Sequence, residues 1–205
     1  MTDGSLYKGT SMPDQGWWSA MFADPEGILR SLRIRPDMTV LDLCCGDGYF
    51  TAPLARMVTG RVYALDLDAA LIDRAKAEID RQGLSISEWI VGDARRADVL
   101  LPERVAYVLM ANTFHGVEDR AALVDTIARC LQEGGRVGLL NWQPRPREET
   151  IVMGQPRGPA TELRMSSADA AASLERGGFT IERIVDVPPY HYGVVARLPA
   201  GPPSL

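Results

Sequence analysis

Several patterns that mark other classes of protein are missing from this sequence of 205 residues. No apolar run approaches the roughly 18–20 residues that a membrane span needs, and residues 1–16 lack the charged-then-apolar pattern of a secretion signal. Lysine occurs only at Lys8 and Lys76 and the net charge is −5, whereas nucleic-acid binders usually carry a basic stripe. We therefore expect a soluble, cytoplasmic protein that binds neither a membrane nor nucleic acid.

Cysteine and histidine are also scarce. The three cysteines, Cys44, Cys45 and Cys130, are odd in number, and their spacing contains no C-x-x-C pair. This excludes a disulfide framework and the usual zinc-site pattern, so we expect reduced thiols and no bound metal. The only two histidines are His115 and His191, which leaves few candidates for a general base near neutral pH.

Short apolar runs alternate with amphipathic stretches, which is typical of β-α units and a mostly parallel sheet. Expected strands are 40–43, 61–65, 88–91, 105–111, 136–142, 180–187 and 192–197, and expected helices are 24–33, 49–58, 68–82, 120–131 and 167–176. The connection between the last two strands is short, which favours an antiparallel hairpin at one edge. We predict a three-layer, Rossmann-like α/β fold with an open sheet of about seven strands.

The whole chain, residues 1–205, is expected to form a single domain with two irregular attachments. One is the N-terminal arm and helix of residues 1–35, a possible lid, and the other is the proline-rich excursion 143–165, a possible cap over a substrate. The excursion carries Arg145, Arg147 and Arg157, which form either a small basic rim or a solvated loop. The state of assembly is expected to be a monomer or a homodimer.

Ligands of open parallel sheets bind beyond the carboxyl ends of the strands. After the first expected strand comes the loop Asp42-Leu43-Cys44-Cys45-Gly46-Asp47-Gly48. Gly46 and Gly48 allow a tight turn and a close approach of a ligand to the backbone. Asp66 ends the second strand, 20 residues after Gly46, where an acid can accept hydrogen bonds from the two hydroxyls of a ribose.

A further acid, Asp93, directly follows the third strand. In this order and spacing, Leu41 to Gly48, then Asp66, then Gly92-Asp93-Ala94 resemble the class I S-adenosylmethionine-dependent methyltransferases, above all the small UbiE-type group. The resemblance covers residues 38–143. It implies S-adenosyl-L-methionine as cofactor, a methyltransferase activity, and the sheet order 3-2-1-4-5-7-6 with strand 7 antiparallel.

The same resemblance assigns roles to individual residues. The glycine loop would lie against the methionine part of the cofactor, the acid Asp66 would bind the ribose, and Asp93 would meet the adenine amine. The cofactor-binding residues expected in full are Asp42, Cys44, Gly46, Gly48, Asp66, Leu67, Asp93, Ala94 and Asn112.

Cys44 stands where the family usually has glycine. We expect either an ordinary φ at Cys44 or a cofactor held slightly farther from the loop.

Two other functions stay open from the residues alone. An NAD(P)-dependent oxidoreductase would carry G-x-G-x-x-G, but the third glycine position is Thr51, and no Tyr-x-x-x-Lys pair is present. A cofactor-binding protein without transferase activity is the other alternative, because no catalytic residue is certain.

The acceptor is expected to be a small molecule, and His115, after the fourth strand, is the candidate general base, with packing as its structural alternative. Candidate substrate residues are Tyr7, Trp18, Trp142, Tyr190 and His191. Trp17 and Trp18 either fold over the cofactor as a lid, fill a gap in the core or meet a second subunit.

Overall fold

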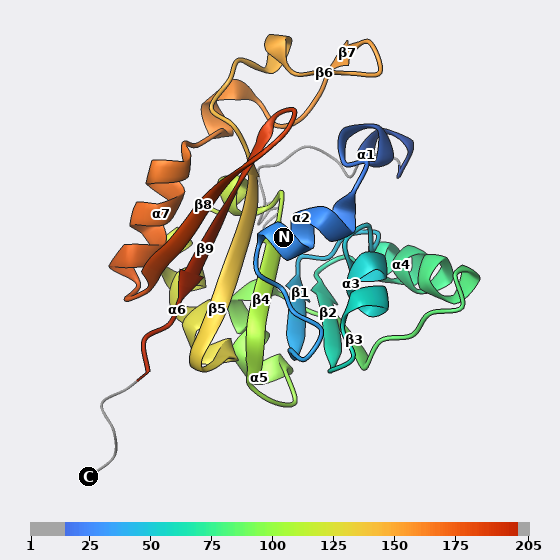
Figure 1. Ribbon diagram of the computed structural model, residues 1–205, viewed down its shortest axis with the longest axis vertical. Coiled ribbons are helices and arrows are strands. Elements are labelled where there is room, and N and C mark those ends of the chain that lie inside the picture. The colour runs from blue at the N-terminus through green and yellow to red at the C-terminus, as the bar shows by residue number, and fades with distance from the viewer. Residues whose placement is uncertain (1–14, 201–205) are drawn as a thin grey trace, which may run out of the picture.

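The computed structural model describes residues 15–200. A seven-stranded sheet in the order β3-β2-β1-β4-β5-β9-β8 runs through the middle of the molecule (Figure 1). The strands are β1 (Val40–Leu43), β2 (Val62–Asp66), β3 (Glu88–Val91), β4 (Val105–Ala111), β5 (Leu131–Trp142), β8 (Thr180–Val187) and β9 (His191–Arg197). The first five are parallel, whereas β9 runs antiparallel to both β5 and β8. The predicted fold class, strand order and edge hairpin are confirmed.

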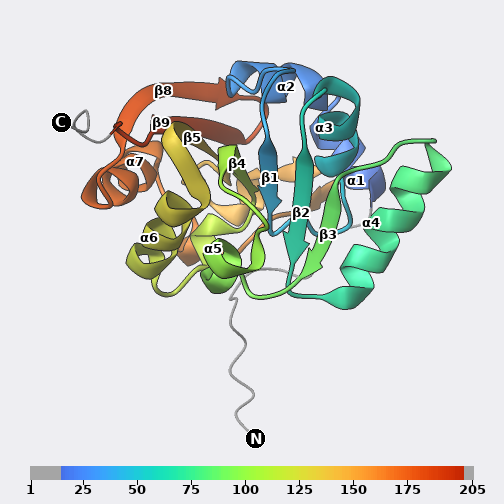
Figure 2. The same cartoon turned by 90° about the horizontal axis from the view of Figure 1, so that it is seen from below.

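Helices cover both faces of this sheet (Figure 2). They are α1 (Gln15–Met21), α2 (Pro25–Ser31), α3 (Thr51–Met57), α4 (Ala69–Arg81), α5 (Ala97–Leu100), α6 (Arg120–Cys130) and α7 (Ser167–Arg176). One face carries α2, α3 and α4, and the opposite face carries α5, α6 and α7.

The two faces follow from the alternation of side chains along the strands. Val40 of β1 belongs to the core beneath α2 and α3, whereas its neighbours Leu41 and Leu43 belong to the core beneath α6 and α7. All four residues of β1 are buried, as expected for a central parallel strand. The ends of β1, β2 and β4 are therefore fixed by packing from both sides, and the loops that follow start from a rigid base.

Side chains at the helix starts explain where several helices begin. The Asp24 carboxylate accepts from Gly27 N at 2.7 Å, and Asp68 accepts from Ala70 N at 2.8 Å. Ser166 and Asp169 form a reciprocal capping box at the start of α7. Side-chain caps therefore fix the starts of α2, α4 and α7.

Some sequence-based boundaries were wrong. A helix begins at Gln15 in a stretch expected to be irregular up to residue 16, and the short α5 was not expected. The helix expected over 49–58 begins only at Thr51, and β5 begins at Leu131 rather than at residue 136. The register of β4 on β5 shifts between Val105 and Tyr107, which allows β5 to extend through its two glycines.

The excursion 143–165 is not wholly irregular. It contains a two-stranded hairpin of β6 (Ile151–Val152) and β7 (Gln155–Pro156), close to α1. The sequence did not predict this hairpin, because strands of only two residues leave no periodic pattern.

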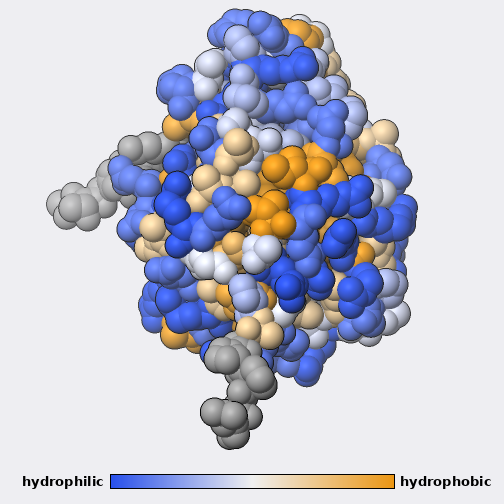
Figure 3. Space-filling model, turned by 60° about the vertical axis from the view of Figure 1, so that its left-hand side comes forward, coloured by the Kyte–Doolittle hydropathy of each residue, from blue (hydrophilic) through white to orange (hydrophobic). Residues whose placement is uncertain are grey.

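Within residues 15–200, no helix is long and apolar enough to cross a membrane. The face brought forward in Figure 3 is mostly hydrophilic, with hydrophobic residues gathered near its centre. The edge strand β8 leaves Ile184 49% exposed.

Candidate active site

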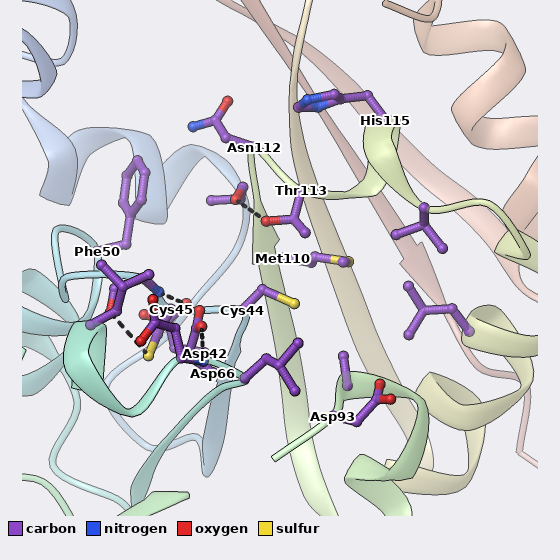
Figure 4. Close-up of a pocket in the computed structure, with 18 of the residues that line it drawn as sticks. Asp42, Cys44, Cys45, Phe50, Asp66, Asp93, Met110, Asn112, Thr113 and His115 are labelled. Carbon is purple, nitrogen blue, oxygen red and sulfur yellow. Dashed lines mark hydrogen bonds between the residues drawn. The ribbon is translucent and has the colours of Figure 1, made fainter. Parts of the chain in front are cut away.

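A cavity of about 340 Å³ opens at the carboxyl ends of β1, β2, β3 and β4 (Figure 4). The loops that follow these four strands meet there, together with α1 and the excursion 143–165. Among the lining residues are Trp17, Trp18, Asp42, Cys44, Gly46, Phe50, Asp66, Leu67, Asp93, Ala94, Arg95, Met110, Asn112, His115 and Trp142.

The glycine loop after β1 turns through three left-handed residues. Cys44 has φ 62°, Gly46 has φ 58° and Gly48 has φ 85°. The expectation of an ordinary φ at Cys44 is therefore wrong: the loop keeps the left-handed turn that glycine would favour and places a side chain on it. The Cys44 sulfur projects from the loop toward the β4 side of the cavity (Figure 4).

Gly48 does not line the cavity. A Cβ at this position would come 2.9 Å from the Cβ of Ala75, so the glycine allows the loop to pack closely against α4. Gly48 therefore helps to position the loop, and its contact with the cofactor stays a prediction.

Asp66 holds the loops after β1 and β2 together. One carboxylate oxygen, Oδ2, accepts from Gly46 N at 2.8 Å, and the other, Oδ1, accepts from Asp68 N at 3.0 Å. Because each carboxylate oxygen can accept two hydrogen bonds, both retain capacity for a further donor in the cavity.

Asp42 is buried beneath the loop. Thr51 donates its hydroxyl to the Asp42 carboxylate at 2.6 Å, which links β1 to the first turn of α3. Burial raises the pKa of Asp42 to about 7, against the opposing effect of the Thr51 hydrogen bond. Burial likewise raises the pKa of Cys44 and Cys45, so both thiols are neutral at physiological pH.

Asp93 lies at the cavity wall but already has a strong partner. Its carboxylate accepts from the Arg95 backbone N–H at 2.9 Å and also binds the Arg95 guanidinium through both oxygens. The Arg95 hydrogen bond holds the pKa of Asp93 below its usual value. Arg95 lines the same cavity, so any ligand amine at Asp93 would share the carboxylate with this guanidinium.

His115 lies beyond the end of β4, on a short 3-10 turn spanning Phe114–Gly116. The turn is fixed by Arg120, which donates to the His115 carbonyl at 3.1 Å. The imidazole is 2% exposed, and burial lowers its pKa to about 4. His115 is therefore neutral at pH 7, and its burial disfavours the protonated form.

The structure separates the expected substrate residues into two groups. Trp18 and Trp142 line the cavity, together with Trp17. Tyr190 and His191 stand behind Trp142, with ring centroids 6.4 Å and 4.3 Å from its ring. Tyr7 lies outside the described residues.

Some lining residues were not expected from the sequence. Phe50, Leu71, Arg95, Val117 and Leu123 complete the cavity. Arg95 carried a local signal, since the backbone N–H two positions after an aspartate often donates to the carboxylate of that aspartate. The others are apolar residues that the sequence cannot distinguish from ordinary core. Among residues 15–200, no cluster of three or more His, Cys, Asp or Glu side chains is placed to hold a metal ion.

Comparisons with known proteins bear on this cavity. Residues 40–135 match the family described as a methyltransferase domain. The crystal structure of a SAM-dependent methyltransferase from Aquifex aeolicus superposes with a TM-score of 0.76 and 25% identity, over 90% of this chain and 94% of that one. Residues 40–135 thus form a methyltransferase domain, and the fold is that of the class I S-adenosylmethionine-dependent methyltransferases. The NAD(P) alternative is thereby set aside.

Two curated relatives are similar over shorter segments. The chain is 30% identical over 140 residues to the protein-L-isoaspartate O-methyltransferase of Aeropyrum pernix, over 67% of this chain and 51% of that protein. It is 45% identical over 62 residues to the 23S rRNA (uracil(1939)-C(5))-methyltransferase of Xanthomonas axonopodis pv. citri, over 30% of this chain and 14% of that protein. The chain therefore spans about half or less of the length of these relatives.

Proposed function

We propose that this protein transfers a methyl group from S-adenosylmethionine to a small-molecule acceptor. The observation that carries the proposal is the enclosure of the acceptor end of the cavity. Trp17 and Trp18 of α1 cover it from one side, Trp142 and Gly158 bound it from another, and the three indoles are 2–7% exposed. A polymer such as RNA or a folded protein would need a more open approach.

The residues around the glycine loop fit the cofactor. Asp66 has acceptor capacity for ribose hydroxyls, and Gly46 lets the backbone approach the ligand closely. Leu67, Asp93 and Ala94 line the part of the cavity where the adenine would lie, while Asp42, Cys44 and Asn112 line the part nearer to the methionine. When bound, S-adenosylmethionine supplies a methyl group on a positively charged sulfur.

The helix α1 and the proline-rich excursion would then cover the acceptor, which is the role expected of these two segments from the sequence. Their contributions to the cavity are the tryptophans of α1 and Gly158 of the excursion. His115 lines this end of the cavity in its neutral form and would be the general base, a weak one because burial lowers its pKa. The chain's remaining contribution is to orient the acceptor and exclude water.

Acceptor class is tested by transfer of labelled methyl from S-adenosylmethionine. The purified protein is offered a panel of small hydroxy-, amino- and thiol compounds, total RNA, and a mixture of unfolded and folded proteins. Label is expected in small molecules alone. Label in RNA or protein, as the activities of the two curated relatives would suggest, would overturn the small-molecule proposal.

The same assay tests His115. His115→Ala is expected to lower turnover by about 10²–10⁴-fold if proton transfer limits the reaction, while affinity for S-adenosylhomocysteine changes little. His115→Gln is the matched variant, since it keeps a polar side chain of similar size without a comparable base. Normal turnover in both variants would make His115 a packing residue.

A further inference from the structure

The acceptor end of the cavity has a continuous aromatic wall, made of Trp17, Trp18 and Trp142. The rings of Trp17 and Trp18 stack with centroids 4.7 Å apart and planes at 29°, and the Trp142 ring lies 6.3 Å from that of Trp17. All three line the cavity. Neighbours cover most of the ring faces, as Trp17 and Phe22 do for Trp18, so the small exposed parts of the rings are what another aromatic ring can contact.

Trp142 is fixed from behind. The Arg164 guanidinium lies 5.0 Å over its ring and donates to the backbone carbonyls of Pro159 at 3.1 Å and Arg157 at 2.9 Å. Gly158, between those two residues, has φ 87°, and a Cβ there would come 2.8 Å from the Trp142 ring. The excursion thus packs its backbone against the indole, and the wall is already formed.

The charges of the cavity lie at its other end. Asp66 ends β2 and Asp93 follows β3, whereas Asn112, Thr113 and His115 follow β4 and lie at the opposite end of the view in Figure 4. Burial keeps His115 neutral by lowering its pKa to about 4. This end therefore offers hydrogen bonds but no charged side chain in direct contact with the cavity.

Arg164 opposes a cationic acceptor on this wall. Its guanidinium already occupies one face of Trp142, and a second cation on the opposite face would be repelled at short range in a poorly solvated site. An anionic carboxylate would reach no cationic partner directly, because Arg164 does not line the cavity and donates to the backbone carbonyls of Pro159 and Arg157. A neutral ligand meets neither cost.

We propose that the acceptor is an uncharged, flat aromatic molecule with a hydroxyl group, which packs against the wall of Trp17, Trp18 and Trp142 and directs the hydroxyl to His115. This inference rests on the proposed function and names its substrate class. It accounts for three indoles at one end of a cavity whose other end carries the charged residues.

The test is calorimetric titration of the full chain saturated with S-adenosylhomocysteine. Four probes of similar size are compared: 2-naphthol, the saturated alcohol trans-2-decalol, the cation 1-naphthylmethylammonium and the anion 2-naphthoate. The flat neutral 2-naphthol is expected to bind at least about tenfold more tightly than each of the others, as one or two aromatic contacts would provide.

Variants assign the binding to the wall. Trp17→Leu and Trp142→Leu are each expected to weaken 2-naphthol binding by up to about tenfold. Trp89→Leu is the matched control, because Trp89 lies on β3 outside the cavity. Affinity for S-adenosylhomocysteine, measured for every variant, reports whether the fold is retained, and Trp17 on α1 keeps the test valid if the Trp142 variant fails to fold.

The outcomes are distinct. Equal binding of decalol, tighter binding of either charged probe, or unchanged 2-naphthol affinity in the Trp17 and Trp142 variants would overturn this inference and leave the proposed function standing. Failure of the unaltered protein to bind S-adenosylhomocysteine would overturn the proposed function and, with it, this inference.

Discussion

The Nε2 atom of His191 lies 2.9 Å from the Oδ1 atom of Asn112, so a buried residue of β9 holds a residue that lines the cavity after β4. Within the described part of the chain, His191 Nδ1 has no hydrogen-bond partner. The proton of the neutral ring is therefore assigned to Nε2, which donates to the Asn112 carbonyl oxygen. Burial lowers the pKa of His191 and keeps it neutral. Asn112 itself has φ 58°, a conformation that benefits from such a tether.

The first prediction concerns this tether. His191→Phe keeps a ring between Phe22 and Trp142 but leaves the Asn112 oxygen without its buried donor. We expect the free energy of unfolding in urea to fall by about 1–3 kcal/mol. Tyr192→Phe, on the same strand, loses a longer hydrogen bond of 3.2 Å to Ser166 and is expected to cost less. If the unfolding free energy of His191→Phe were unchanged, the hydrogen bond between His191 and Asn112 would not stabilise the fold.

The second prediction concerns Asp42 and pH. Its pKa is raised on folding from 3.8 to about 7, so the folded state binds the proton more tightly than the unfolded chain. The resulting stability is full below about pH 4 and is lost as the pH rises through about 7. Asparagine does not titrate, so Asp42→Asn should remove this loss. The difference in unfolding free energy between the variant and the unaltered protein should shift in favour of the variant by on the order of 1–4 kcal/mol from pH 4 to pH 8.

Urea unfolding at several pH values measures this difference. Asp73→Asn is the matched control, because the Asp73 side chain on α4 is 78% exposed and should leave the profile unchanged. The Asp42 carboxyl would have an ordinary pKa if the profiles of the Asp42 variant and the unaltered protein ran parallel from pH 4 to pH 8.

The third prediction isolates the backbone strain at Cys44. Cys44→Ala and Cys44→Gly both remove the thiol, but only glycine adopts φ 62° without a steric penalty. The glycine variant is expected to be more stable by about 1–2 kcal/mol. Cys130 ends α6 in an ordinary helical conformation, so the same pair there should show the reverse order, by roughly 0.5–1 kcal/mol. If the alanine variant were the more stable one at both positions, the loop at Cys44 would be unstrained.

Much of the framework could be predicted from the sequence, because it depends on patterns that repeat. Continuous apolar runs such as 105–111 mark buried parallel strands, and local cap residues such as Asp24 mark helix starts. The placement of Asp66 and Asp93 at the ends of neighbouring strands follows from the same reasoning. These features are local or periodic, and the structure reproduces them.

The features that escaped prediction depend either on contacts between distant segments or on the detailed geometry of a local turn. The tether of His191 to Asn112 joins residues 79 positions apart, and the support of Trp142 by Arg164 needs the path of the excursion. The left-handed Cys44 was unexpected because a side chain argues against that conformation, and the loop imposed it nonetheless. The Arg95 ion pair on Asp93 likewise depends on a local turn whose geometry the residue types only partly determine.

We propose that Asp66 holds S-adenosylmethionine by its ribose hydroxyls, and calorimetric titration of Asp66→Ala measures this contact. The unaltered protein should bind S-adenosylmethionine and S-adenosylhomocysteine, and Asp66→Ala should weaken both by about 1.5–3 kcal/mol, since hydrogen bonds to a charged group are lost. Asp73→Ala, on the exposed side of α4, should bind as the unaltered protein does. No binding of either compound to the unaltered protein, or equal affinities in the Asp66 variant, would contradict the account.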